Sequence, residues 1–309
     1  MKTESDLFEE FAGFDRFGFP EGIERMTAGP GGESLLILGS EKTALLDCGM
    51  ACCAGQLIEN IKKGLGGRAL DYVLLSHTHY DHIGALPYIK QAWPGVLTAG
   101  AEHAGKVLSK QGAIRTINSL SENAFRLFGG TGEFHIPGEG FGIDIVARDG
   151  DRISLGEEEV VVLETKGHTD CSLTFVLEPL GVMFASESTG VLEAPEEMHV
   201  SILKNYRDAM ASVEKCRDYG ASLIVSPHFG IIPEHYNSRY WELFLSASAY
   251  YRGFLFDMFD LGLSEDEILD KYSEVHWDER RKKEQPKEAF LLNVRNIVKA
   301  FRSEWELQR

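Results

Sequence analysis

The segment "LLSHTHYDHIGALP" (residues 74–87) constrains the fold of this chain more than any other feature. Four potential metal ligands, His77, His79, Asp81 and His82, fall within six residues there, although the chain has only ten histidines in 309 residues. The apolar run "YVLLS" precedes them, and the helical pattern "IGALPYIKQAW" follows. The segment therefore predicts a buried strand followed by a helix, and in open α/β sheets functional sites lie where strands end.

The spacing of the four side chains favours two adjacent metal positions. His77 and His79 are two residues apart, and at a strand end such residues point the same way, so both imidazoles can reach one point. Asp81 and His82 follow where the chain turns into a helix, and they can face a second point close by. Imidazole and carboxylate suit zinc, iron or manganese. Paired metals in hydrolases lie roughly 3.5–4 Å apart, which fits so compact a segment.

Further ligands must come from other parts of the chain. Three polar side chains each follow an apolar segment with the character of a strand: His168 in "ETKGHTDCS", Glu187 in "FASES" and His228 in "VSPHFG". Because all three occupy the same strand-end position as the histidine segment, we predict that they complete the site.

These motifs together resemble the metallo-β-lactamase fold superfamily. The H-x-H-x-D-H segment matches the signature of that family as it stands, and "LLDCG" (45–49) matches its Asp-x-Gly element. "GHTDCS" is similar to its Gly-His-Thr element, "SE" (186–187) to its Gly-Asp element, and "PHFG" to its closing Gly-His. The resemblance covers roughly residues 25–232. It implies an α/β (α+β) fold, the αββα four-layer sandwich, with metals at one edge.

The resemblance also implies a role for each residue. A hydroxide shared by two divalent metals, with zinc as the implied ion and iron or manganese as alternatives, would attack a small ester, thioester, lactone or phosphodiester. Asp81 would be the catalytic residue that accepts a proton or orients the nucleophile, and Asp47 would lie beneath the metals. The implied ligands are His77, His79 and His168 for the first metal, Asp81, His82 and His228 for the second, and Glu187 at the bridging position.

Three features depart from the family pattern. Glu187 is one methylene longer than the usual aspartate, so it can bridge, bind one metal or change the distance between the metals. Asp170 and Cys171 stand where Pro-Gly is frequent, and the thiol either packs under the loop or approaches the metals. His135 lies in a Gly-rich stretch and is a candidate to meet the substrate.

The chain changes character near residue 235. Residues 1–235 read as a β/α/β-rich catalytic domain with an insertion at 111–140, and residues 236–309 as a helical extension that packs on or near the active site. "SEDEILDKYSEVHW" opens with a capping box. The aromatic stripe at 240–259 is either the buried face of a helix or part of a lid or acyl-binding wall. These helices could also form a homodimer through exposed aromatics.

Composition narrows the possible partners and compartment. The net charge of −17 argues against nucleic acid, so a small-molecule substrate is expected. No run reaches 18 apolar residues, and no membrane partner is expected. The N-terminal "MKTESDLFEEFAGFDRF" is acidic and lacks an apolar core, so we expect no signal peptide and a cytoplasmic location. Five cysteines, an odd number, indicate reduced thiols rather than a disulfide framework.

Three functions compete at this point. The first is a dinuclear metal hydrolase, and the layout of the chain resembles the quinolone-signal response thioesterase of the superfamily. The second is a non-haem iron redox enzyme of the same fold. The diiron reductases, however, carry a glutamate where His79 stands, followed by a flavodoxin domain, and neither feature occurs here. The third is a binding or signalling protein with a vestigial metal site, which predicts poor metal retention.

Overall fold

The computed structural model describes residues 19–309, which divide into two compact units. The first unit holds residues 19–164 together with Leu173–Phe184, and the second holds Thr165–Ser172 and Ala185–Arg309. The acidic N-terminal stretch, on which the expected absence of a signal peptide rests, lies outside the described residues.

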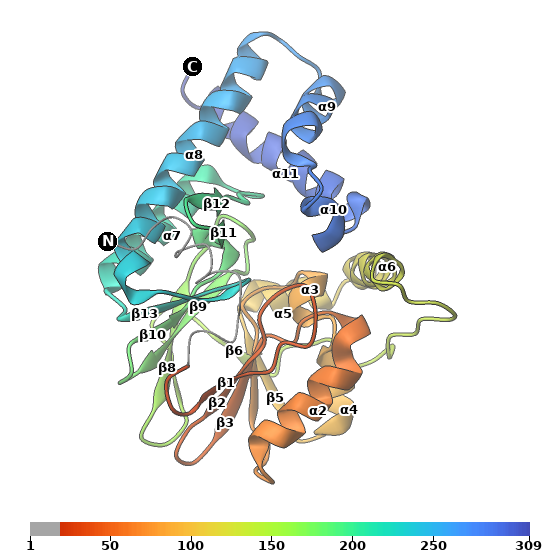
Figure 1. Ribbon diagram of the computed structural model, residues 1–309, viewed down its shortest axis with the longest axis vertical. Helices are drawn as coiled ribbons and strands as arrows, with labels where there is room; N and C mark the ends of the chain where they lie inside the picture. Colours follow the sequence, from red (N-terminus) through yellow and green to blue (C-terminus); the bar gives the residue numbers. More distant parts are fainter. Residues whose placement is uncertain (1–18) are drawn as a thin grey trace. The chain divides into compact units, whose positions relative to one another are not determined.

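A six-stranded sheet is the centre of the first unit (Figure 1). Its strands follow chain order from β1 to β6; β1, β2 and β3 pair antiparallel, and β3 to β6 pair parallel. The apolar runs LLIL and TALL form β2 and β3, and both strands are almost wholly buried. The strands are Ile23–Arg25 (β1), Leu35–Leu38 (β2), Thr43–Leu46 (β3), Tyr72–Leu74 (β4), Leu97–Gly100 (β5) and Ile145–Val146 (β6).

Helices connect the parallel strands, because such strands need crossover connections. In Figure 1, α2 and α4 lie on one face of this sheet. The sequence predicted one helix over residues 83–93, but the structure ends one helix at Ile83 and begins another at Leu86. Pro87 explains the break, since proline fits the first turn of a new helix and not a helix interior. The helices are Ala54–Leu65 (α2), Tyr80–Ile83 (α3), Leu86–Ala92 (α4), Glu102–Leu108 (α5) and Gln111–Leu127 (α6).

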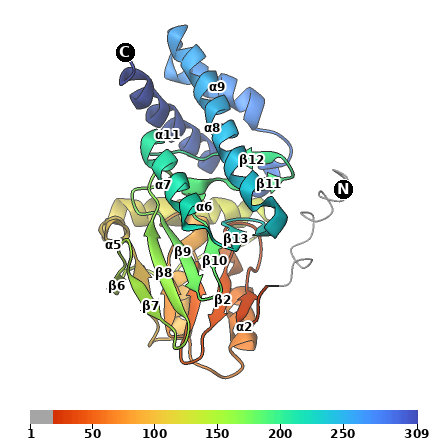
Figure 2. The same ribbon diagram turned by 90° about the vertical axis from the view of Figure 1, so that its left-hand side faces the viewer.

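The remaining strands of the first unit form an antiparallel meander. They lie beside the first sheet in both views (Figures 1 and 2). The two sets of strands are joined at one end, where the backbone N–H groups of Glu41 and Lys42 donate to the carbonyl of Leu155 at 2.9 and 3.0 Å. The strands are Arg152–Ser154 (β7), Glu159–Glu164 (β8), Leu173–Glu178 (β9) and Val182–Phe184 (β10).

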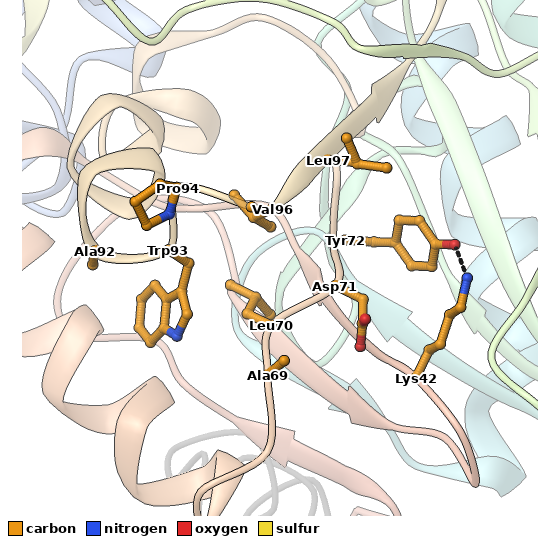
Figure 3. Close-up of a pocket in the computed structure, with 11 residues that line it drawn as sticks. Lys42, Ala69, Leu70, Asp71, Tyr72, Ala92, Trp93, Pro94, Val96 and Leu97 are labelled. Atoms are coloured by element: carbon orange, nitrogen blue, oxygen red, sulfur yellow. Dashed lines mark hydrogen bonds between the residues drawn. The ribbon is translucent and has the colours of Figure 1, made fainter.

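An open pocket of about 380 Å³ lies at the amino ends of β4 and β5 (Figure 3). Tyr72, Trp93 and Leu97 contribute to its lining, and the Lys42 ammonium donates to the Tyr72 hydroxyl at 2.6 Å across its wall. His77 follows the carboxyl end of β4, so this pocket lies at the other end of the strand from the histidine segment.

The second unit contains short hairpins and the C-terminal helices. The helical character predicted from about residue 236 is confirmed, whereas the hairpin of β11 and β12 was not predicted because its strands are short and partly polar. No helix within residues 19–309 has both the length and the apolar character that crossing a membrane requires. The elements are Val191–Ala194 (β11), Glu197–His199 (β12), Tyr206–Tyr219 (α7), Leu223–Ser226 (β13), Gly230–Ile232 (β14), Asn237–Asp260 (α8), Glu265–His276 (α9), Arg281–Glu284 (α10) and Lys287–Glu306 (α11); single 3₁₀ turns are Ala51–Cys53 (η1, in the first unit), Glu187–Thr189 (η2) and Glu234–Tyr236 (η3).

The aromatic stripe of α8 is a buried helix face, as one of the two predictions for it stated. Tyr240, Phe244 and Tyr251 are each less than 8% exposed. Tyr251 packs against rings of α9, with centroid distances of 6.1 Å to Tyr272 and 5.1 Å to His276. These contacts hold the C-terminal helices together through large apolar surfaces.

Helix α9 begins with the capping box that the sequence predicted. The Ser264 hydroxyl accepts from the backbone N–H of Glu267, and the Glu267 carboxylate accepts from the backbone N–H of Ser264 at 2.9 Å. Replacing Ser264 with alanine removes one cap, so we expect the free energy of unfolding to fall by about 1 kcal/mol. Urea denaturation measures this, and Ser264→Thr, which keeps a hydroxyl, should remain close to the unsubstituted protein.

Candidate metal centre

The first unit brings the four residues of the histidine segment together. The ring centroid of His77 lies 4.6 Å from that of His79 and 4.2 Å from that of His82. A carboxylate oxygen of Asp81 lies 3.8 Å from Nε2 of His82. His77 and His82 are fully buried, whereas His79 and Asp81 are partly exposed. The segment therefore presents three imidazoles and one carboxylate as a compact set of donors that is accessible from one side.

Asp47 is the residue that orients this set. It follows β3, which runs parallel to β4, so the two strands end at the same edge of the sheet. Its carboxylate accepts from the backbone N–H of Ser76 at 2.7 Å, from the Ser76 hydroxyl at 2.5 Å and from Nδ1–H of His82 at 2.8 Å. The backbone of Asp47 has φ +50°, a conformation that aspartate tolerates better than most residues.

These hydrogen bonds also determine which ring nitrogen of His77 and of His82 is free to bind a metal. The single hydroxyl proton of Ser76 goes to Asp47, so the Ser76 oxygen accepts from Nδ1–H of His77 at 3.0 Å. His82 likewise has its Nδ1 proton on Asp47. In both rings Nε2 therefore keeps its lone pair. Histidines that bind metals are oriented in this way, through a hydrogen bond from the other ring nitrogen.

A glycine-rich loop at residues 29–32 lies against the same segment. The backbone N–H of Gly32 donates to the carbonyl of Asp81 at 3.1 Å. A Cβ atom at Gly32 would stand 2.5 Å from Nδ1 and Cε1 of His82, which is closer than real Cβ contacts. Only glycine at this position leaves room for the His82 ring, and no sequence motif indicated this role of Gly32.

Replacing Gly32 with alanine should therefore displace His82. We expect the variant to lose one of two metal equivalents after dialysis, because an oriented ligand is removed from one position while His77 and His79 remain. Elemental analysis of the purified variant measures the loss. Gly55→Ala is the matched control, since a Cβ there meets no atom within 4 Å. Full metal retention by Gly32→Ala would show that the loop does not position the ring.

The second unit holds a second set of donors around His168. Nδ1 of His168 donates to the carbonyl of Ser201 at 2.7 Å, so Nε2 again keeps its lone pair. The backbone N–H of His168 donates to the Ser188 hydroxyl at 3.1 Å, and the ring is fully buried. Sequence reasoning found the histidine but neither of its partners, because a carbonyl acceptor can belong to any residue type.

Glu187 lies between His168 and His228, both in the second unit. One carboxylate oxygen lies 3.4 Å from Nε2 of His168, and the other lies 3.2 Å from Nε2 of His228. Glu187 opens the 3₁₀ turn η2, and its side chain is 11% exposed. The longer side chain thus reaches both imidazoles, which is the arrangement that a bridging carboxylate needs.

Other sequence candidates have different surroundings. Cys171 is buried, and its sulfur lies 3.3 Å from the Thr169 hydroxyl, which agrees with a packing role. His135 is exposed, and its carbonyl accepts from the Tyr88 hydroxyl at 2.5 Å. His199 has its pKa lowered well below the usual value, mainly by burial and also by Arg281.

Two curated proteins are similar to part of this chain. Glyoxylase B2 of Dictyostelium discoideum is 29% identical over 108 residues, 35% of this chain and 32% of that protein. A probable metallo-hydrolase of Burkholderia pseudomallei (strain 1710b) is 31% identical over 124 residues, 40% of this chain and 36% of that protein. The chain thus spans about a third of the length of the curated relatives it matches.

The fold and a family model extend over more of the chain. A metallo-beta-lactamase family protein from Thermus thermophilus has a TM-score of 0.63 at 19% identity, over 93% of this chain and 95% of that one. This likeness concerns the fold alone, and it confirms the fold class that the sequence predicted. A family model described as the metallo-beta-lactamase superfamily matches residues 29–228, about two thirds of the chain. The chain therefore belongs to the metallo-beta-lactamase superfamily.

Proposed function

We propose that this protein is a hydrolase that uses two divalent metals to cleave a small ester, thioester, lactone or phosphodiester. Family membership supports the class of reaction. The observation that carries the proposal is the orientation of the histidines. His77, His82 and His168 each have Nδ1 engaged in a hydrogen bond within their own unit, so each offers Nε2 to a metal.

The proposed ligands combine the donors of both units. Within the first unit, ligand atoms of His77 and His79, and likewise of Asp81 and His82, lie within 4.8 Å of each other. Such a mixture of imidazole and carboxylate suits zinc, with iron or manganese as alternatives. We assign His77, His79 and His168 to one metal, Asp81, His82 and His228 to the other, and Glu187 to the position between them.

The residues of the chain divide the chemistry between them. Bound divalent metals supply a lowered water pKa, towards 7, and polarisation of the oxygen of the bond to be cleaved. Asp81 is partly exposed beside His82, where its carboxylate can accept a proton from the attacking water and orient it. Glu187 places one carboxylate oxygen beside Nε2 of His168 and the other beside Nε2 of His228, where it could share a metal with each imidazole. Asp47 fixes the tautomer of His82 directly and that of His77 through Ser76.

Metal content followed by a hydrolase panel tests the proposal. We expect two equivalents of zinc per chain in freshly purified protein, and turnover of at least one ester, thioester, lactone or phosphodiester. Removal of the metal by a chelator should abolish this turnover, and added zinc should restore it. Asp81→Asn should keep most of the metal but lose turnover, because the amide cannot accept a proton.

The alternatives predict other results of the same experiment. Two irons, a coloured protein and consumption of oxygen would support the redox enzyme instead. Metal far below one equivalent, with no hydrolysis of any compound in the panel, would support a binding protein with a vestigial site. Turnover that persists after the metal has been removed would contradict the proposed function directly.

A further inference from the structure

Sulfur atoms are concentrated in one short segment of the first unit. The stretch "CGMACC" carries Cys48, Met50, Cys52 and Cys53, four of the sulfur-containing side chains in a chain with 5 cysteines and 7 methionines. It follows β3 and ends in the 3₁₀ turn η1. Cys52 and Cys53 are both partly exposed, and their sulfurs lie 3.9 Å apart. Cys52 and Cys53, which the sequence predicts to be reduced, therefore lie close together and are partly exposed to solvent.

The distance between these two sulfurs fits a chelate better than a disulfide. Adjacent Cα atoms are about 3.8 Å apart across a trans peptide, below the range of about 4.4–6.8 Å that disulfides need. Two thiolates bound to one ion at about 2.3 Å, in tetrahedral or trigonal geometry, stand about 3.8–4.0 Å apart. The observed 3.9 Å falls in this interval, so both sulfurs can bind one ion without a change of backbone.

A small cavity beside Cys53 gives a second, independent observation. Its volume is about 10 Å³, enough for about one water molecule or ion, and Cys48, Met50 and Cys53 line it. Ser34 also lines the cavity and is 1% exposed, and its hydroxyl has no hydrogen-bond partner within residues 19–309. A buried polar atom of this kind indicates a bound species, because leaving it unsatisfied costs about 1–3 kcal/mol.

We propose that this segment binds one soft cation, Cu⁺, through the thiolates of Cys52 and Cys53, with the thioether of Met50 as a third donor. Thiolate and thioether together favour Cu⁺ over harder ions. Binding converts each thiol to a thiolate and releases its proton to solvent, with no transfer of electrons.

The loop at residues 29–32 connects this site with the histidine segment. A Cβ atom at Gly29 would stand 2.6 Å from the Cys53 sulfur, and one at Gly31 would stand 3.1 Å from Cε of Met50. Gly32, at the other end of the loop, lies against His82. Movement of the sulfur side chains toward an ion would therefore press on this loop, whose other end lies against His82. The last step rests on the proposed function: bound Cu⁺ should lower the affinity for the metal held by Asp81 and His82.

An anaerobic titration of the full, reduced chain with Cu⁺ tests the site, with bathocuproine disulfonate as the competing ligand. We expect one equivalent of Cu⁺ to bind to the zinc-loaded protein. Cys53→Ser should weaken the affinity at least 100-fold, and Cys52→Ser should do the same. Cys216→Ser, in α7 of the second unit, is the control and should bind as the unsubstituted chain does. Circular dichroism checks that each variant is folded.

Two further measurements identify the atoms that bind copper and separate this test from the proposed function. X-ray absorption should show sulfur neighbours around the copper, whereas nitrogen neighbours would overturn the proposal by placing the ion on histidines. Unchanged Cu⁺ affinity in Cys53→Ser and Cys53→Ala, or preference of the segment for Zn²⁺, would also overturn it. His168→Ala, which removes a proposed metal ligand of the second unit, should bind Cu⁺ normally, so failure of the hydrolase assays leaves this test independent of the proposed function.

Discussion

Replacing His79 with alanine is expected to reduce turnover of a model ester by at least about 100-fold. Even residues that only orient a metal ligand change metal affinity or activity by about 10–100-fold, and His79 is assigned as a ligand itself. Its side chain is partly exposed at the end of the loop before α3, so its removal should leave the fold intact. Initial rates and zinc content per chain should fall together.

A second histidine substitution separates this effect from a general loss of charge or volume. His235→Ala changes an exposed histidine of the 3₁₀ turn η3, and it should retain both turnover and zinc. The assignment of His79 would fail if its alanine variant hydrolysed the ester at the normal rate with stoichiometric zinc still bound. Thermal unfolding of both variants without metal should show equal midpoints.

The second large effect is expected at Asp47. Alanine there removes the acceptor for three hydrogen bonds and leaves the buried N–H groups of Ser76 and His82 without partners, at about 1–3 kcal/mol each. Alanine also tolerates φ +50° poorly. We expect the free energy of unfolding of the metal-free protein to fall by about 3–5 kcal/mol, and zinc affinity to fall about 10–100-fold. Urea denaturation and zinc titration measure the two effects.

Asp47→Asn distinguishes the two contributions. Asparagine accepts the same backbone conformation and keeps one acceptor oxygen, so most of the stability should return. Its amide has one acceptor oxygen where the carboxylate has two, so it cannot accept from the Ser76 backbone N–H as well as from the Ser76 hydroxyl and His82. Zinc affinity should therefore stay low. If Asp47→Asn bound zinc normally, the carboxylate would not be the group that sets the histidine tautomers.

The candidate ligands could be selected from the sequence because they are distinctive in type and follow apolar strands. His77, His79, Asp81 and His82 are chemically unusual neighbours, and the strand before them is recognisable from its composition alone. The parallel order of β3 and β4 then brings Asp47 to the same edge of the sheet. The structure confirms the strand and its position, and the role of these residues as metal ligands stays a prediction.

The supporting contacts were not predictable, since they depend on backbone atoms and on space. Ser201 acts through a carbonyl that any residue would supply, and Gly32 acts by lacking a side chain beside His82. Ser76 relays between Asp47 and His77, but a serine before a histidine carries no signal of its own. Such contacts join residues distant in the chain, and only the folded structure brings them together.

The position of Glu187 was only partly predictable from the sequence. Its extra methylene left several arrangements open in the sequence, and the structure shows one carboxylate oxygen near each of two imidazoles. Its metal contact stays a prediction.

The shared anchor at Asp47 has a thermodynamic consequence. The Asp47 carboxylate accepts Nδ1–H of His82 directly, and it orients Nδ1–H of His77 through the hydroxyl of Ser76. We assign these two histidines to different metals. Under the proposed assignment, an ion on Nε2 of His77 would restrain its ring and, through Ser76, the carboxylate of Asp47. That restraint would reach His82 through the same carboxylate. Loading of the two proposed positions would thereby be linked, and substitutions that loosen Asp47 are expected to reduce cooperativity as well as affinity.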